Sequence, residues 1–265
     1  MLVITDDLRR VIRLRKPATR IISLAPSVTE HAFASGAGAC VVGITSYCDT
    51  PVAAQSILRV GDFTRPSYER IVSLKPDLVI VESGTITLSA VTELEQKLKV
   101  PVFVMLSSTY AAIGMHIKQM AVLTGKGTGV ASAIRRLDQS ETSARRLSKG
   151  VTPPRVLMII SETPLFVAGP EGYLGDIIHL AGGINVVGKG AFPQVSPESI
   201  LIADPDIIVV GANSSGRPEP LFGPLKALRA ARMGKVVCVP GGTLGRPTVR
   251  TAAGLLELAR VINKG

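Results

Sequence analysis

Two stretches of sequence decide the fold, and they match at a constant offset of 129 residues. They are Glu69-Arg-Ile-Val-Ser-Leu-Lys-Pro-Asp-Leu-Val-Ile-Val81 and Glu198-Ser-Ile-Leu-Ile-Ala-Asp-Pro-Asp-Ile-Ile-Val-Val210. In each, a short helix is predicted to end before a proline, because the residue preceding proline disfavours helical backbone, and a continuous apolar strand follows. The match predicts an internal duplication.

Outward from these stretches, the two halves keep one order of elements. An apolar strand over 20–24 or 155–160 precedes a predicted helix, which stops at glycines near Gly36 or Gly182. Closing strands are predicted over 100–105 and 235–239. We therefore expect an α/β fold with two similar lobes, residues 1–126 and 150–265, each a small, mostly parallel sheet with flanking helices.

Residues 127–149 join the predicted lobes. Apolar residues recur there at helical spacing among charged ones, which predicts an amphipathic helix of about 20 residues and about 30 Å. As one long rigid helix it would link the lobes with little hinge motion and leave a ligand cleft between them. The alternative is a helix packed wholly on one lobe.

Composition restricts the classes of function. The chain has 265 residues, 46% of them hydrophobic, and no tryptophan, which favours a globular protein over a disordered one. The formal charge of +10 is scattered, and its basic clusters lack the interleaved aromatics that stack on bases, so no nucleic-acid partner is expected.

Sequence signatures of catalysis, cofactors and metals are missing. The cysteines form no CxxC and the histidines no HxxH, so we expect no metal site, and one disulfide between Cys40 and Cys48 is left open. Neither GxGxxG nor GxSxG occurs where it would be needed, so we expect no cofactor and no enzyme activity. The cysteines are Cys40, Cys48 and Cys238, and the histidines are His31, His116 and His179.

Two local patterns mark candidate sites. Ser27 and Glu30 have the spacing of a capping box, which predicts a helix starting directly after the first strand. Ser67 and Ser196 are predicted N-caps, which place Glu69 and Glu198 at the second helical position of each lobe. These glutamates either only compensate the helix dipole or present paired carboxylates to a partner that carries arginines.

The few aromatic residues fall near predicted sheet ends. Tyr47 and Phe63 lie in loop regions of the first lobe, and Phe166 and Phe192 lie in corresponding regions of the second. Aromatic side chains are usually core, but four of them near sheet ends predict a cleft for a large, flat or apolar ligand.

Several segments together resemble the helical-backbone (class III) substrate-binding proteins of ABC importers, above all their cobalamin-binding members. The resemblance covers about residues 4–264, and it implies the two-lobed fold inferred above. It rests on these segments: Arg20-Ile-Ile-Ser-Leu-Ala-Pro-Ser-Val-Thr-Glu30, Gly43-Ile-Thr-Ser-Tyr-Cys-Asp-Thr-Pro51, Val60-Gly-Asp-Phe-Thr-Arg-Pro-Ser-Tyr-Glu-Arg-Ile71, Leu74-Lys-Pro-Asp-Leu-Val79, Ala181-Gly-Gly-Ile-Asn185 and Phe192-Pro-Gln-Val-Ser-Pro-Glu198.

The resemblance also implies roles for individual residues. It implies that Glu69 and Glu198 dock on arginines of the two permease subunits, one lobe to each. The residues implied to bind the corrinoid ligand are Pro26, Ser27, Tyr47, Phe63, Glu82, Phe166, Phe192 and Arg246. Position 82 and positions 63 and 192 carry tryptophan in well-known relatives, so this chain offers a smaller aromatic surface and an added charge.

The expected function is capture of a cobalamin-like corrinoid by a monomer that delivers it to the permease dimer of an ABC importer. One alternative is an iron-siderophore or haem-binding protein of the same class, although Gly61-Asp-Phe-Thr-Arg65 lacks the Tyr or His ligand usual in haem-binding relatives. The other is an enzyme similar to a tetrapyrrole metal chelatase.

The start of the chain does not look like a signal peptide. Residues 1–20 lack an apolar core, because Asp6, Asp7 and the five basic residues between Arg9 and Lys16 interrupt it. From these residues alone, either the protein is cytoplasmic or a leader was removed. The resemblance implies a periplasmic or membrane-anchored extracellular protein whose signal segment is not among these residues.

Overall fold

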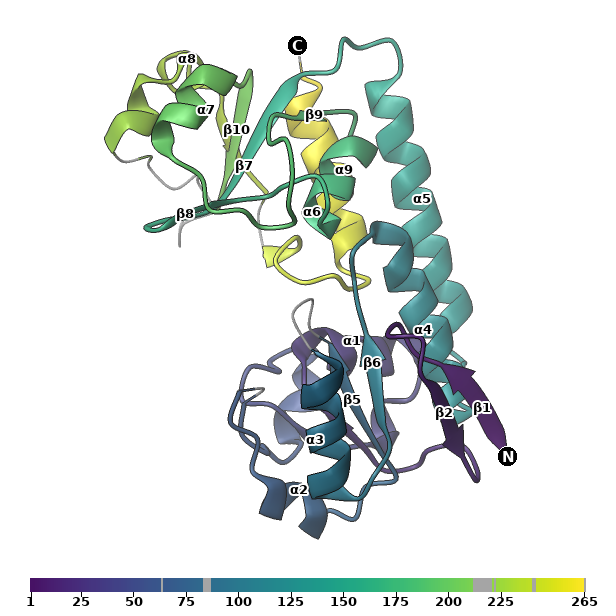
Figure 1. The fold of residues 1–265 in the computed structure, drawn as a ribbon. Coiled ribbons are helices and arrows are strands. Elements are labelled where there is room, and N and C mark those ends of the chain that lie inside the picture. Colours follow the sequence, from purple (N-terminus) through teal and green to yellow (C-terminus); the bar gives the residue numbers. More distant parts are fainter. Residues whose placement is uncertain (63, 83–86, 212–220, 222, 240–241, 265) are drawn as a thin grey trace. The chain divides into compact units, whose positions relative to one another are not determined.

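The structure is a computed structural model that describes residues 1–62, 64–82, 87–211, 221, 223–239 and 242–264. The chain divides into two compact units (Figure 1). Unit 1 comprises Met1–Ser107 and Ala111–Arg135, and unit 2 comprises Ser108–Tyr110 and Arg136–Gly265. Each unit is α/β with its own sheet and flanking helices, as predicted.

Unit 1 is built on a four-stranded parallel sheet in the order β4-β3-β5-β6. An antiparallel hairpin, β1-β2, precedes it and was not predicted from the sequence. The strands are β1 (Leu2–Thr5), β2 (Val11–Leu14), β3 (Ile21–Ser23), β4 (Val41–Ile44), β5 (Leu78–Glu82) and β6 (Val102–Met105). The helices are α1 (Pro26–Ser35), η1 (Gly38–Cys40), η2 (Val52–Ser56), α2 (Tyr68–Ser73), α3 (Leu88–Leu98) and α4 (Tyr110–Thr124), whose first residue belongs to unit 2.

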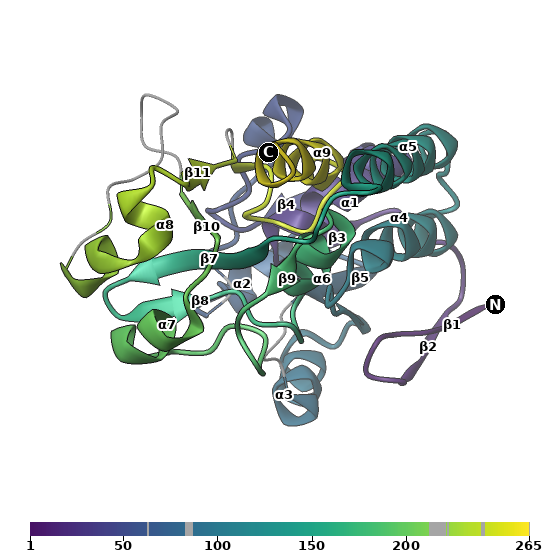
Figure 2. The same ribbon diagram turned by 90° about the horizontal axis from the view of Figure 1, so that it is seen from above.

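The strands of the four-stranded sheet are buried on both faces, as continuous apolar runs predict. Alternate residues of β5 point to opposite faces, so Ile80 packs with α1, α4 and the hairpin, whereas Val79 and Val81 pack with α2 and α3. Figures 1 and 2 show these helix pairs on either side of the sheet. Because both faces are packed against helices, the strands are held in place, and so is the sheet edge at which they end.

Unit 2 has a five-stranded sheet in which β7 is central. Its first residues pair with β9 in parallel, and its last residues form an antiparallel hairpin with β8. The path continues from β7 through β10 to β11 in parallel. The strands are β7 (Arg155–Glu162), β8 (Leu165–Val167), β9 (Ile184–Asn185), β10 (Ile207–Val210) and β11 (Val236–Cys238). The sequence did not predict β8.

Helices cover both faces of this sheet too. One cluster joins β7, β8 and β10 with α7, η3 and α8. On the other face, Gly183 lies where Val156 of β7, Ile178 of α6 and Ile262 of α9 converge, so a side chain at 183 would collide with them. The helices are α6 (Tyr173–Leu180), α7 (Pro197–Ala203), η3 (Gly223–Ala227), α8 (Arg229–Arg232) and α9 (Thr251–Ile262).

The amphipathic helix predicted over 127–149 is present as α5 (Val130–Ser148), and the division between the units falls within it. Its action as a rigid link, like the lobe boundaries drawn from the sequence, stays a prediction. Among the described residues, we find no helix with the length and apolarity needed to cross a membrane.

The duplication is confirmed where the repeated helices and strands begin. Helix α2 begins at Tyr68 and α7 at Pro197, and β5 begins at Leu78 and β10 at Ile207, each pair at the predicted offset.

Each copy also contains the same arginine–aspartate clamp. In unit 1, Asp77 accepts a hydrogen bond from the backbone N–H of Arg20 (3.0 Å), and the Arg20 guanidinium donates to the carbonyl of Leu74 at the end of α2 (2.9 Å). In unit 2, Asp206 accepts from Arg155 N–H (2.9 Å), and Arg155 donates to the carbonyl of Ala203 at the end of α7 (2.7 Å). Each clamp ties a helix end to the start of a sheet strand, β3 in unit 1 and β7 in unit 2.

Removing the acid of one clamp should destabilise its unit. We expect Asp77→Ala to lower the free energy of unfolding by about 1–3 kcal/mol, because it leaves the N–H groups of Thr19 and Arg20 without their acceptor. Denaturant titration measures the loss. Asp206→Ala should act similarly, and Asp138→Ala, an exposed position on α5, should stay within about 0.5 kcal/mol. Equal stability of the Asp77 and Asp138 variants would contradict the role of the clamp.

Candidate functional site

The predicted ligand residues of unit 1 gather at one edge of its sheet. Because β3, β4 and β5 are parallel, their carboxyl ends meet at that edge, where open α/β sheets bind ligands. Pro26 and Ser27 follow β3, Tyr47 follows β4 and Glu82 is the last residue of β5. The structure therefore brings four of the predicted residues to a common edge.

The predicted capping box is wrong. Helix α1 begins at Pro26, two residues before the start that Ser27 as N-cap predicts, and Ala25 is its N-cap without a side-chain hydrogen bond. Proline lacks the N–H that a cap would satisfy, and its φ angle suits the first helical position. Ser27 and Glu30 consequently lie inside the helix and are buried.

The predicted aromatic residue Tyr47 lies on the surface of unit 1. Tyr47 is 65% exposed in the turn after β4, and that turn is held to the next loop by a bond from Ser46 N–H to the carbonyl of Gly61 (2.9 Å). Phe63 lies outside the described residues. An exposed ring on an anchored turn is available for contact with a ligand.

Glu82 lies close to a chain of polar contacts in unit 1. In the sheet it pairs with Met105 of β6, and Ser107 follows two residues later. The Ser107 hydroxyl lies 3.2 Å from Nδ1 of His116, and His116 Nε2 lies 2.7 Å from Oδ2 of Asp7. Burial raises the pKa of Glu82 to about 7, against the opposing effect of the nearby Ser107.

The pKa of Asp7 is shifted in the opposite direction, downward. Burial raises its pKa, but hydrogen bonds from His116 and from the N–H of Leu106 outweigh this and leave the pKa below its ordinary value. Asp7 is therefore a carboxylate over a wide pH range. The sequence pointed to none of Asp7, Ser107 and His116 as functional, because residues of these types, far apart in sequence, carry no spacing signal.

His31 lies beside this network on α1. It is fully buried, and its ring meets that of His116 edge-on with centroids 5.6 Å apart. Neither ring nitrogen has a hydrogen-bond partner among the residues that the structure describes. Burial and, secondly, the neighbouring His116 lower the pKa of His31 to about 3.

Two of the three cysteines lie in the core of unit 1. Cys40 and Cys48 are buried, free thiols, so the bridge left open by the sequence is not formed. Among the described residues, the structure holds no group of three or more His, Cys, Asp or Glu arranged to hold a metal ion.

In unit 2, the segments that carry the predicted aromatic residues Phe166 and Phe192 lie side by side. Phe166 is in the short strand β8 and not in a loop as predicted, because the chain turns back after β7 to form a hairpin. It is bridged to Gln194, two residues beyond Phe192, so the Phe192 segment runs along β8. Phe192 is 49% exposed. Arg246 lies in the segment before α9, anchored by Thr251 through the Arg246 carbonyl (2.9 Å).

The two candidate docking glutamates occupy equivalent positions in their units. Ser67 caps α2 by accepting from Arg70 N–H, and Ser196 caps α7 by accepting from Ser199 N–H, as predicted. Glu69 and Glu198 are thus at the second helical position, and both are exposed.

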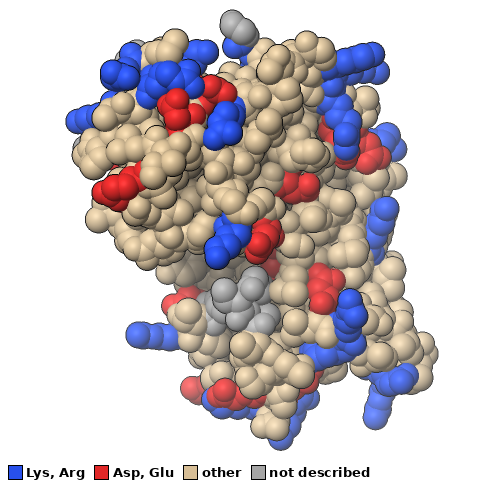
Figure 3. Space-filling model, turned by 45° about the horizontal axis from the view of Figure 1, so that its top comes forward, with Lys and Arg blue, Asp and Glu red and all other residues tan. Residues whose placement is uncertain are grey.

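Figure 3 shows the basic residues of the visible face scattered and mixed with acidic ones, as the sequence predicted.

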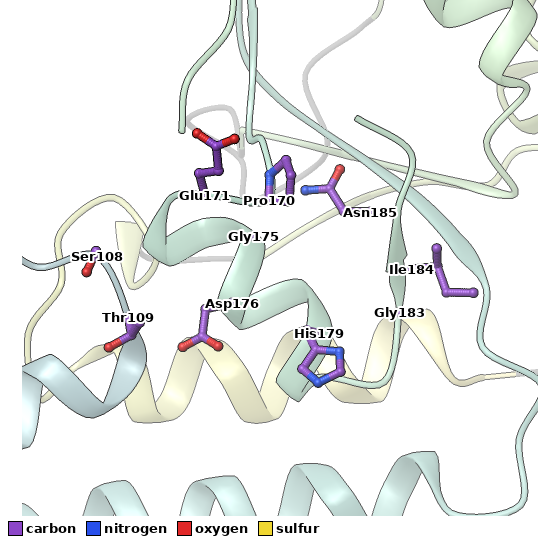
Figure 4. Close-up of a pocket in the computed structure, with 10 residues that line it drawn as sticks. All are labelled: Ser108, Thr109, Pro170, Glu171, Gly175, Asp176, His179, Gly183, Ile184 and Asn185. Carbon is purple, nitrogen blue, oxygen red and sulfur yellow. The ribbon is translucent and has the colours of Figure 1, made fainter. Parts of the chain in front are cut away.

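Unit 2 also holds a pocket of about 550 Å³ that the sequence did not predict (Figure 4). Asp176 and His179 project from the same side of α6 toward it. Asp176 has a structural role there, because its carboxylate accepts the N–H of Tyr110 (2.7 Å) at the start of α4. The lining residues are Ser108, Thr109, Pro170, Glu171, Gly175, Asp176, His179, Gly183, Ile184 and Asn185.

The chain is similar in sequence to known proteins over most of its length. A family model described as "Periplasmic binding protein" matches residues 21–237. The vitamin B12-binding protein of Vibrio parahaemolyticus is 25% identical over 245 residues, which cover 92% of this chain and 89% of that protein.

Solved structures agree in fold. The periplasmic vitamin B12 binding protein BtuF of Vibrio cholerae is similar with a TM-score of 0.80 and 27% identity, covering 93% of this chain and 97% of that one. The periplasmic heme-binding protein RhuT from Roseiflexus sp. RS-1 has a TM-score of 0.75 and 25% identity, covering 93% and 98%. The similarities extend over both units.

Proposed function

Because this chain belongs to the periplasmic binding protein family, we propose that it captures a cobalamin-like corrinoid outside the cytoplasm and delivers it to an ABC importer. One observation carries the proposal: the similarity to vitamin B12-binding proteins spans almost the whole chain in both sequence and structure. The corrinoid class comes from those relatives and from the aromatic residues of the candidate site.

Each unit contributes groups suited to such a ligand. A corrinoid combines an extensive apolar ring with amide side chains at its periphery. In unit 1, the exposed ring of Tyr47 and the carboxyl group of Glu82 stand at the sheet edge, and in unit 2 Phe166, Phe192 and Arg246 offer aromatic and charged contacts. Aromatic contact supplies affinity, and a few polar groups fix orientation.

Calorimetry with cyanocobalamin and cobinamide tests the proposal. We expect binding at micromolar concentration or tighter, and a loss of at least about tenfold in affinity for Phe192→Ala, since burying one such side chain contributes about 1.5–3 kcal/mol. Ile202→Ala, an exposed apolar position on α7, is the matched control and should bind like the parent protein. Absence of heat with either corrinoid would refute the assignment.

Haem is the second candidate cargo, because a heme-binding protein is among the structural relatives. Titration with haemin, followed by its absorption spectrum, separates the two. Haemin binding that cyanocobalamin cannot displace would favour haem over the corrinoid.

Glu69 and Glu198 are proposed to dock on the importer. They are exposed, capped in the same way and repeated once per unit, so a partner with two equivalent basic sites could be contacted twice. Carboxylates on a fixed helix turn form strong paired hydrogen bonds with arginine.

A further inference from the structure

We propose that Cys48 and Arg59 are positioning residues for cargo binding. They hold the turn at residues 45–48 from two sides, so that Tyr47 is fixed at the ligand edge of unit 1 before cargo arrives. Both act through Tyr47, because Cys48 is fully buried and the Arg59 guanidinium bonds to the backbone of the turn. The inference rests on the proposed function in one respect, because it takes Tyr47 to contact the cargo.

The turn that carries Tyr47 is short and closed by backbone hydrogen bonds. It directly follows β4, and the N–H of Cys48 donates to the carbonyl of Thr45 across it (3.2 Å). Between them, the N–H of Ser46 donates to the carbonyl of Gly61 in the next loop (2.9 Å). The Tyr47 side chain therefore extends from a turn whose residues on both sides are hydrogen-bonded through their backbone.

The Cys48 side chain joins the turn to the interior of unit 1. Its sulfur lies 3.2 Å from the hydroxyl of Thr29 and 3.2 Å from the hydroxyl of Thr45, within hydrogen-bonding distance for sulfur. The Thr29 hydroxyl, on α1, is also 2.8 Å from that of Ser23, the last residue of β3. All four side chains are buried, where a polar group that loses its partner destabilises the fold. The network thus connects the turn after β4 with the helix that follows β3.

The Arg59 side chain holds the same turn from the neighbouring segment. Its Nη1 donates to the carbonyl of Thr45 (3.0 Å) and to the carbonyl of Cys48, so one guanidinium group bonds to both ends of the turn. Hydrogen bonds from a charged donor are stronger than those between neutral groups. Arg59 is itself held in place, because the residues before and after it form backbone hydrogen bonds with Ile44 of β4 (3.0 and 2.9 Å).

The two supports would raise the affinity for cargo by ordering Tyr47 in advance. A turn that is mobile in the free protein must be ordered when cargo binds, and that ordering costs part of the binding free energy. A turn that is ordered during folding avoids this cost. We therefore expect the loss of either support to weaken binding, although neither side chain needs to touch the cargo.

Relaxation of the backbone ¹⁵N spins in the ligand-free protein tests the supports. We expect an order parameter of about 0.85 for the Tyr47 amide in the parent protein, and of less than about 0.6 in Arg59→Met and in Cys48→Ala. Cys48→Ser, which keeps a polar group between the two threonine hydroxyls, should restore most of the order. A value that stays near that of the parent protein in Arg59→Met or in Cys48→Ala would overturn the role of that residue.

Two control variants separate this role from a general loss of stability. Arg135→Met removes an exposed guanidinium group from α5 and should leave the Tyr47 amide as ordered as in the parent protein. Asp77→Ala breaks the clamp at the opposite end of the β3-β5 pair, and it should lower stability while leaving the order of Tyr47 unchanged. If Asp77→Ala loosens Tyr47 as much as Arg59→Met does, the positioning role is overturned.

A double-mutant cycle with cyanocobalamin tests the role toward cargo. Calorimetry should show that Arg59→Met weakens binding about fivefold or more in the parent protein, and less than about twofold when Tyr47→Ala is already present. The second loss is smaller because Arg59 acts through Tyr47. Equal losses in both backgrounds would overturn that action. If the parent protein does not bind cyanocobalamin, the proposed function fails, and the relaxation experiment still decides whether the two residues hold the turn.

Discussion

Charge reversal of both candidate docking acids, Glu69→Arg with Glu198→Arg, is expected to abolish importer-dependent uptake of labelled cyanocobalamin and leave cyanocobalamin affinity within about twofold. Replacing an acid that meets an arginine by a second cation introduces repulsion worth several kcal/mol at each contact, so docking should weaken by about a thousandfold or more. The measurements are uptake by cells that carry the importer and calorimetry of the purified variant.

The matched control reverses one acid per unit elsewhere, the exposed Glu93→Arg on α3 with the partly exposed Glu257→Arg on α9. Because it changes net charge equally, it separates a local docking effect from a general effect of charge. Uptake should persist in this control. Equal loss of ligand affinity in the Glu69 and Glu198 variant would instead place those residues in the ligand site.

Acid should destabilise the protein through His31. The pKa of this buried ring is about 3, against an ordinary value near 6.5, so its contribution to stability is complete above about pH 6.5 and is lost as pH falls toward 3. By about pH 4.5, two units below the ordinary value, the loss amounts to about 3 kcal/mol. His31→Leu should remove this loss, because leucine does not titrate and leaves no unpaired nitrogen.

The test compares the two proteins at each pH, because Glu82 acts in the opposite direction. Its pKa is raised, so its contribution is complete below about pH 4.5 and is lost as pH rises through 7. Denaturant titrations from about pH 7.5 to pH 4 should show His31→Leu gaining stability over the parent protein as pH falls. A difference in free energy of unfolding that does not change with pH would mean that His31 takes up a proton as readily in the folded protein as in the unfolded one.

The elements that the sequence predicted best are those with local or repeated signals. Helices α2 and α7 and the strands that follow them carry a cap, a proline and an apolar run, and the repeat supports each with the other. The start of α1 was misplaced because two local signals competed, and Pro26 at the first position prevailed over Ser27 as a cap.

The interior of the candidate site was harder to predict. Asp7 and His116 are 109 residues apart, and only the packing of α4 and the hairpin against the sheet brings them together. Glu82 was identified by resemblance, but its raised pKa comes from burial, which a sequence does not display. Strand β8 is short, so its pattern was too brief to distinguish a strand from a loop.

The repeated clamp bears on how the molecule would be recognised. Each clamp binds the C-terminal end of a glutamate-bearing helix to the sheet, through Arg20 and Asp77 in unit 1 and through Arg155 and Asp206 in unit 2. The helices that carry Glu69 and Glu198 are therefore held in place at one end. Both glutamates are therefore already ordered in the folded protein. Binding to a receptor would cost little additional conformational entropy.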